Sequence, residues 1–436
     1  MKKRIVSTLL SIVTVSNLIT GCSSPDIRTA SGAPNSSGIS NAPDITNEYN
    51  PSNVSAETLA SSNADFNSAL ISYIEQNGFA EENYMISPTS YRAAMALAIV
   101  GADNATKEEL LHAMGFNDMN ELVAWYVSVT ESVDKYNEWL KDAQKDFKEN
   151  REDYGDGASK PSGVFDLENS IWRNTTNATG ELSQDYMDYV AKNFNAAANN
   201  VSSDKITNAV NDWIDENTDG LIRSISDDLS ASDLILINTL YLKASWKNDF
   251  DEYCTEEGDF TTIFGDTVSK DFMNQQEEFL YYEDDDCKFV VLPMNGGINA
   301  VFILGDATGV MDKMSEASYE DVAVSIPKFV TETSFSQNEL IGFCMDRGAT
   351  SAFNEDADFS IMSDEMDLFI TDIIQKTKID VDEKGVRAAA ATAIIMKAGC
   401  AEIEEVKEFT ADQPFTYMIL TDSETPELLF YGQLVK

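Results

Sequence analysis

The side chains that could carry catalytic chemistry are few, and their spacing supports no active site. His112 is the only histidine among the 436 residues, so a Ser-His-Asp or Cys-His site would depend on it alone. It stands in KEELLHAMGF, which predicts the polar edge of a helix, and no nucleophile-elbow motif accompanies it. Cys400 has only Lys397 nearby and no base that would make it an attacking thiolate. The sequence therefore predicts a protein that is not an enzyme.

Cofactor motifs are missing from the sequence as well. It contains no P-loop, no dinucleotide-binding glycine fingerprint and no clustered His/Cys metal ligands. The acidic run from Glu283 to Asp286 is typical of a solvated turn rather than of a calcium-binding loop. We therefore expect neither a metal nor a cofactor.

The most unusual stretch runs from Glu383 to Phe415. Its four consecutive alanines, Ala388 to Ala391, favour a helix, but the stretch follows Gly385 and lies between the strand-like runs FITDIIQKTKIDV and FTYMIL. If it forms a strand, one face is uncharged and both charges fall on the other face. The uncharged face would comprise Val386, Ala388, Ala390, Thr392, Ile394 and Met396. The pattern predicts a segment that can be exposed as a loop and can also join a sheet.

The start of this stretch resembles the hinge of the reactive loop of serpins, a family of protease inhibitors. The matching residues are Glu383, Lys384, Gly385, Val386, Arg387, Ala388, Ala389, Ala390, Ala391 and Thr392. Val386 replaces a small hydroxyl residue of the family pattern, and Arg387 replaces an acid. On the strand alternation Val386 points inward and Arg387 outward, so neither change forbids insertion into a sheet.

The resemblance covers about Ala60 to Lys436 and implies the architecture of the family. It implies an α+β fold with a large central mixed β-sheet, smaller β-sheets and about eight to nine helices. We expect a single domain over residues 63–436, with the reactive-centre loop over residues 383–408.

The resemblance also implies a suicide inhibitor of a serine protease, with cysteine proteases as further candidates. In that mechanism the protease cleaves the loop, and the freed hinge inserts into the sheet while the protease is still covalently attached. Spacing from the hinge places the cut between Gly399 and Cys400, whereas counting back from Phe409 places it between Cys400 and Ala401. Both choices put a small residue before the cut, which suits an elastase-like pocket. A trypsin-like cut after Lys397 stays open, as does a non-inhibitory surface binding protein of the same fold.

Further motifs resemble the family's shutter and gate, the regions that control opening of the sheet. The stretch from Asn83 through Ser87, Pro88 and Ser90 resembles a family cluster beneath the central strands, with hydroxyl side chains that cap a helix. Asn238 lies in a matching strand, and Gln375 stands where many serpins have a histidine. The resemblance pairs Lys328 with Glu383 at the end of the sheet where the loop must enter.

One internal segment does not fit the family pattern. Residues 131–162 are polar and charged, and we expect a surface insertion that is helical at first, disordered later and without a convincing core face.

The N-terminus predicts export. Residues 1–21 combine Lys2, Lys3 and Arg4 with an apolar run, as in a signal peptide, and the sequence before Cys22 resembles a bacterial lipobox. Lipidation of Cys22 would anchor the protein at the bacterial cell surface through a flexible Ser/Asn/Pro-rich tether over residues 22–62. An ordinary signal peptide with a chance cysteine is the alternative.

The net charge argues against nucleic acid and anionic membranes as partners. Thirty basic and 75 acidic side chains give a net charge of −45, which opposes binding to nucleic acid and anionic membranes. We expect a monomer whose only membrane attachment is lipid at Cys22. The remaining cysteines, Cys254, Cys287, Cys344 and Cys400, are widely spaced and predict no disulfide framework, although a Cys254–Cys287 bridge stays open.

Overall fold

The computed structural model of the chain describes residues 48–152, 159–176, 180–335, 337–363, 368–386 and 406–436. Within these ranges it contains eight α-helices: α2 (Ala56–Ile74), α3 (Pro88–Gly101), α4 (Asn104–Ala113), α5 (Met119–Glu149), α6 (Gln184–Phe194), α7 (Ser203–Asn217), α8 (Val310–Lys313) and α9 (Gln337–Asp346). The number agrees with the expectation of eight to nine helices. None of these helices is long and apolar enough to cross a membrane.

The strands form two sheets. They are β1 (Tyr84–Ile86), β2 (Val164–Asn174), β3 (Ala196–Val201), β4 (Leu234–Ser245), β5 (Glu256–Thr261), β6 (Thr267–Glu283), β7 (Cys287–Met294), β8 (Ile298–Gly305), β9 (Ser318–Pro327), β10 (Phe329–Phe335), β11 (Asp372–Asp382), β12 (Gly385–Val386), β13 (Lys407–Thr410), β14 (Phe415–Thr421) and β15 (Leu428–Leu434). A nine-stranded sheet has the order β1-β15-β14-β8-β7-β6-β9-β13, with β5 paired to β6. A six-stranded mixed sheet has the order β10-β11-β12-β4-β2-β3. Eight helices on a mixed sheet with a second sheet confirm the predicted α+β class.

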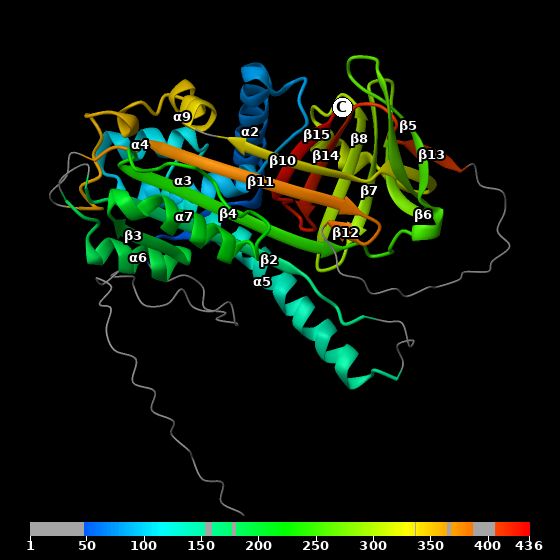
Figure 1. Cartoon of the computed structure of the whole chain (residues 1–436), viewed down its shortest axis with the longest axis horizontal. Helices are drawn as coiled ribbons and strands as arrows, with labels where there is room; N and C mark the ends of the chain where they lie inside the picture. The colour runs from blue at the N-terminus through cyan, green and yellow to red at the C-terminus, as the bar shows by residue number, and fades with distance from the viewer. Residues whose placement is uncertain (1–47, 153–158, 177–179, 336, 364–367, 387–405) are drawn as a thin grey trace, which may run out of the picture.

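The long strands of the six-stranded sheet join the two ends of the molecule. In Figure 1, β4 and β11 run side by side from the helices at the left to the nine-stranded sheet at the right, where the short β12 lies. β4 and β11 pair in parallel, whereas β2 and β4 are antiparallel. β12, at the start of the predicted hinge, pairs with Ala244 and Ser245 at the right-hand end of β4.

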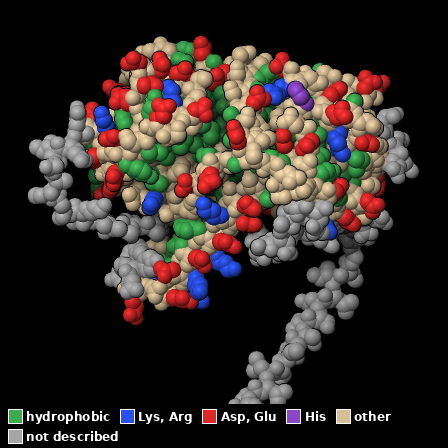
Figure 2. Space-filling view, turned by 180° about the vertical axis from the view of Figure 1, so that it is seen from behind, with side chains coloured by type: hydrophobic (Ala, Val, Ile, Leu, Met, Phe, Trp, Pro, Cys, Tyr) green, Lys and Arg blue, Asp and Glu red, His purple; other side chains and the backbone are tan. Residues whose placement is uncertain are grey.

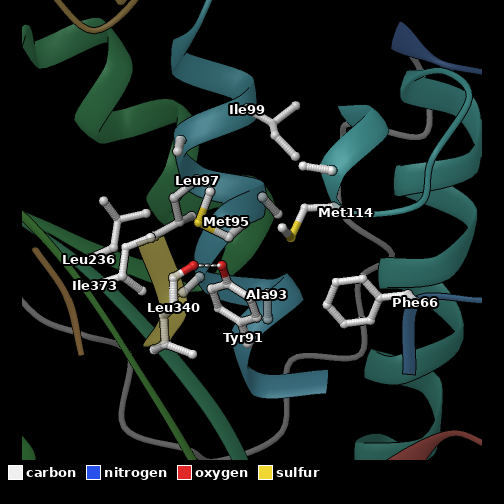
Figure 3. Close-up of a cluster of buried hydrophobic side chains, with 14 of the residues drawn as sticks. Phe66, Tyr91, Ala93, Met95, Leu97, Ile99, Met114, Leu236, Leu340 and Ile373 are labelled. Atoms are coloured by element: carbon white, nitrogen blue, oxygen red, sulfur yellow. Dashed lines mark hydrogen bonds between the residues drawn. The ribbon is translucent and has the colours of Figure 1, made fainter. Parts of the chain in front are cut away.

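Helices cover both faces of β4. Its side chains therefore alternate between two apolar clusters. Leu236 packs in the main core with α3 and lies beside Ile373 of β11; Phe66 and Leu340 of the flanking helices belong to the same core (Figure 3). Ile237 belongs to the opposite cluster, which includes Val210 of α7. A strand buried on both faces needs apolar residues at consecutive positions, as the sequence LILI provides.

α3 begins where the sequence predicted a helix cap. The Ser87 hydroxyl accepts a hydrogen bond from the Ser90 amide, and Pro88 occupies the first turn, where its missing N–H costs nothing. All 14 residues of α3 are buried. The segment therefore fixes the position of the polar side chains beneath the six-stranded sheet.

The expectation that residues 131–162 lack a core face is wrong for the helical part. α5 continues to Glu149 and projects from the body in Figure 1, but Tyr136 is fully buried and donates a hydrogen bond to the Lys243 carbonyl. Val133 and Trp139 pack beside it against the same cluster. Their spacing of three residues was the signal that the polar composition obscured.

Acidic side chains are spread over the surface. Figure 2 shows many Asp and Glu side chains distributed across this face, with fewer Lys and Arg side chains among them. The net charge of −45 is thus carried by many separate sites rather than by one patch on this face.

Candidate functional site

The first residues of the predicted loop hinge are part of the six-stranded sheet. β12, which consists of Gly385 and Val386, is antiparallel to both of its neighbours: Val386 pairs with Val381 of β11 and with Ala244 of β4. Val386 is 3% exposed. Its inward direction agrees with the alternation derived from the sequence.

Gly385 permits this close approach. Its φ of +140° is a conformation that favours glycine, and a Cβ atom there would lie 2.2 Å from the Ala244 carbonyl oxygen. Any larger residue would push the hinge away from β4.

Beyond Val386 the two neighbouring strands are separated. β4 and β11 pair directly only over Ile235–Ile237 and Asp372–Ile374. Above these pairs lies a narrow pocket that extends up to Val386. Its walls include Leu240 and Leu242 of β4, Thr377 and Ile379 of β11, and Leu221 and Ile222 after α7.

A buried polar cluster lies where the strands separate. Ser90 hydrogen-bonds to Asn238 of β4, whose side-chain amide bonds to Asn169 of β2. Gln375 of β11 accepts a hydrogen bond from the Ser87 amide and donates one to the Ser87 carbonyl, both at 2.9 Å. α3 is therefore hydrogen-bonded to both strands that must separate for a new strand to enter.

The structure brings together most of the predicted shutter residues but places Asn83 elsewhere. Asn83 donates to the Lys436 carbonyl and accepts from the amides of Val435 and Lys436, so it holds the end of the chain. Its side chain is therefore not part of the hydrogen-bonded cluster around Ser90, Asn238 and Gln375. Asn169, which accepts the hydrogen bond from Asn238, was not among the predicted site residues.

An ion pair lies at the end of the sheet where the hinge enters. Lys328 Nζ is 3.0 Å from Glu383 Oε2, and the Thr255 hydroxyl donates to Glu383 Oε1 at 2.8 Å. Burial raises the pKa of Glu383, but the hydrogen bonds from Lys328 and Thr255 outweigh it and leave the pKa below its ordinary value. The same hydrogen bond raises the pKa of Lys328. The pair that the sequence predicted is therefore formed, with both partners charged at neutral pH.

Trp246 fixes the turn that carries the hinge. Its indole N–H donates to the Asp382 carbonyl at 2.9 Å, and its amide donates to the Lys384 carbonyl at 3.1 Å. The amide of Phe250 donates to the Glu383 carbonyl at 2.9 Å. Trp246 also packs against Phe250 and Phe302.

Several predicted site residues lie outside the described residues. They are the hinge residues Arg387, Ala388, Ala389, Ala390, Ala391 and Thr392, the candidate cleavage residues Gly399, Cys400 and Ala401, and the candidate lipidation site Cys22. Whether the alanine run is helical or extended before cleavage therefore stays a prediction.

The other reactive side chains do not converge on the hinge. His112 is exposed on the last turn of α4. Cys254, Cys287 and Cys344 are free thiols, and burial raises the pKa of Cys344 to about 12. Among the described residues, no three His, Cys, Asp or Glu side chains are grouped to hold a metal ion.

Comparisons with known proteins agree with this geometry. The family model described as "Serpin (serine protease inhibitor)" matches residues 61–436. An uncharacterised serpin-like protein of Methanosarcina acetivorans is 29% identical over 86% of this chain and 85% of its own length. The leukocyte elastase inhibitor of Sus scrofa is 26% identical over 87% of this chain and 99% of its own length. Among solved structures, thyroxine-binding globulin in complex with thyroxine superposes with a TM-score of 0.70 at 20% identity, covering 86% of this chain and 98% of that protein.

Proposed function

Because the chain belongs to the serpin family of serine protease inhibitors, we propose that it inhibits a serine protease as a suicide substrate. The protease would cleave the loop and form an acyl-enzyme, and the freed hinge would insert as a strand before hydrolysis is complete. The observation that carries the proposal is that Gly385 and Val386 are already paired with β4 and β11 at the mouth of the pocket between these strands.

The register of β12 defines where the inserted strand would lie. Val386 faces Ala244 and Val381, so each later residue of the loop faces a residue one position earlier in β4 and in β11. Ala388 would therefore face Leu242 and Ile379 on the buried side of the sheet. Small side chains at these positions match the limited space of the pocket.

The same register explains how the sequence can depart from the family pattern at Arg387. Arg387 would face Lys243 and Asp380 on the outer side of the sheet, as the alternation requires. A cross-strand pair with Asp380 offsets the repulsion from Lys243. Insertion past Thr392, which would face Asn238 and Gln375, must break the direct pairs between β4 and β11.

Insertion would carry the attached protease along the sheet. From Gly385 to Gly399 is 14 residues, which corresponds to about 45 Å at about 3.3 Å per residue. The native fold would then be maintained by a kinetic barrier, since the cleaved form is more stable.

The target we propose is an elastase-like protease, because Gly399 or Cys400 would precede the cut and both are small. The name of the porcine relative, leukocyte elastase inhibitor, supports this choice. A trypsin-like protease that cuts after Lys397, and cysteine proteases, are the further candidates.

The test is to incubate the protein with pancreatic or neutrophil elastase and to analyse the mixture on a denaturing gel. We expect an SDS-stable adduct whose mass equals that of the protease plus the cleaved inhibitor. We also expect cleaved protein to melt at a higher temperature than uncut protein. Cleavage near Gly399 without an adduct and without a rise in Tm would contradict the proposal.

A second candidate function is that of a non-inhibitory binding protein. It is favoured by the similarity of the fold to thyroxine-binding globulin, which was solved with a bound ligand, and by the unusual residues Val386 and Arg387. The gel distinguishes the two, because a binding protein forms no adduct.

For localisation we propose export and lipid anchoring at Cys22, so that the protein acts at the bacterial cell surface as a monomer. The basic start, the apolar run and the lipobox-like residues support this. Metabolic labelling with a fatty-acid analogue should mark the wild-type protein and not Cys22→Ala; equal labelling would exclude this site.

A further inference from the structure

A second ion pair holds the hinge, next to the one made by Glu383. Lys384 Nζ lies 3.7 Å from Asp249 Oδ2 and 3.6 Å from Glu252 Oε1. The side chains of Lys384 and Asp249 are only 17% and 13% exposed, whereas that of Glu252 is 68% exposed. Asp249 is therefore the buried partner, and the contribution of Glu252 is screened by water.

Few interactions offset the cost of burying the Asp249 carboxylate. The distance of 3.7 Å is too long for a hydrogen bond, and Asp249 Oδ2 has no hydrogen-bond partner among the described residues. When the carboxylate is ionised, this oxygen has lost water without gaining a hydrogen-bond donor that replaces it. Burial raises the pKa of Asp249 to about 6, although the positive charge of Lys384 lowers this pKa.

The neighbouring charges do not remove this penalty. On the hinge turn, Asp382 lies close enough to raise the pKa of Asp249 further. Glu383 is already paired with Lys328. The other charged side chains nearby are Lys247 on the same turn and Asp251 and Glu252 at the 3₁₀ helix Glu252–Cys254.

The segment that carries Asp249 is docked directly on the hinge turn. Trp246 and Phe250, which flank Asp249, donate the three hydrogen bonds to the carbonyls of Asp382, Glu383 and Lys384 described above. Separation of the hinge from this segment would expose Asp249 to water. The carboxylate would then regain an ordinary pKa near 3.8.

We propose that Asp249 is a positioning residue that loosens the docked hinge when it is ionised and allows it to dock firmly when it is neutral. The docked state binds the proton more tightly, so docking must strengthen as the pH falls from above 6 toward 3.8 and stay constant below that. Between pH 7.5 and pH 5 these two pKa values correspond to a change of about tenfold in the docking equilibrium.

The inference rests on the proposed function for its biological meaning. The inserted strand continues in the register of β12, so a docked hinge is the nucleus from which insertion proceeds. A looser hinge at neutral pH should slow insertion and allow more acyl-enzymes to hydrolyse. At pH 5 a larger share of encounters should end as covalent complex.

Hydrogen exchange of the full chain tests docking without any protease. The amides of Trp246 and Phe250 donate to the hinge, so their protection reports the docked state. After correction for the intrinsic pH dependence of exchange, we expect the wild-type protein to be about tenfold more protected at pH 5 than at pH 7.5. In Asp249→Asn, protection should be high at both pH values.

Three variants separate charge from packing. Lys384→Met leaves the Asp249 charge without its cation, so protection at pH 7.5 should fall below that of the wild-type protein. Adding Asp249→Asn to Lys384→Met should restore it. Glu256→Gln removes an exposed carboxylate from the neighbouring strand β5 and should leave the pH profile of the wild-type protein unchanged.

The inference fails if wild-type protection does not change with pH, or if Asp249→Asn shows the same profile as the wild-type protein. Failure to form a covalent complex with any protease would contradict the proposed function alone, because exchange is measured on the free protein. The two outcomes can therefore be told apart.

Discussion

Replacing Ala390 by Arg tests the insertion register directly. Continuing β12, Ala390 would face Leu240 and Thr377, and the Thr377 hydroxyl is bonded to the Met85 carbonyl beneath the sheet. An arginine there would have to be buried without a partner, at a cost of about 3–5 kcal/mol. If half or more of that cost is felt in the transition state for insertion, insertion slows at least about tenfold to a hundredfold.

The adjacent residue supplies a matched control. Ala389 would face Tyr241 and Lys378 on the outer side; Tyr241 is buried, but Lys378 is 30% exposed, so an arginine beside it can reach water. Repulsion from Lys378 is limited because that lysine already lies 3.4 Å from Glu332, so Ala389→Arg should cost less than about 1 kcal/mol.

The assay is the ratio of covalent complex to cleaved inhibitor on a denaturing gel, over a range of inhibitor concentrations. For Ala390→Arg we expect this ratio to fall by one to two orders of magnitude while cleavage continues, and for Ala389→Arg to stay within about fivefold of the wild-type value. The cleaved Ala390→Arg protein should also show a smaller rise in Tm. Equal ratios for the two variants would refute the register.

Three further predictions concern the described residues. Lys328→Met should lower the stability of the native form by about 1 kcal/mol, since Lys328 is 37% exposed. In the wild-type protein this contribution should be present at neutral pH and be lost as the pH falls through the lowered pKa of Glu383, so equal stability of variant and wild type in chemical denaturation at pH 7 would contradict it. Asn238→Ala should cost about 2–3 kcal/mol in chemical denaturation, because Ser90 and Asn169 lose their shared partner; a change under 0.5 kcal/mol would show that the cluster contributes little. Tyr136→Ala should cost about 3–4 kcal/mol and release α5 from β4, measured as faster hydrogen exchange in residues 131–145; unchanged exchange would show that the helix is held elsewhere.

The parts of the site that depend only on neighbouring residues in the sequence could be predicted from it. The cap of α3 at Ser87 and Pro88 depends only on neighbouring residues. The inward direction of Val386 depends only on strand alternation. The pairing of Lys328 with Glu383 spans distant positions, and it came from the family resemblance rather than from the residues themselves.

The residues that were missed depend on tertiary contacts. Asn169 looks like any strand residue until β2 is placed beside β4, and Asp249 looks like a solvated acid until the hinge turn covers it. Tyr136 is surrounded by charges in sequence, and only the packing of α5 on the end of β4 shows that it is buried. Asn83 was misplaced for the opposite reason, because a motif groups residues by sequence whereas its side chain reaches the C-terminus.

Two residues make opposing contributions to the free energy of hinge docking, so the hinge is docked but only weakly held at neutral pH. Burial of Val386 between Ala244 and Val381 favours docking, by about 1.5–3 kcal/mol for a side chain of this size. The ionised, poorly solvated carboxylate of Asp249 opposes it, and the raised pKa near 6 implies a cost of similar order at neutral pH. A small hydroxyl residue at position 386, as in the family pattern, would bury less apolar surface and shift this balance toward release. The valine is therefore best understood together with Asp249: one residue holds the hinge in the sheet, and the other keeps that hold weak at neutral pH.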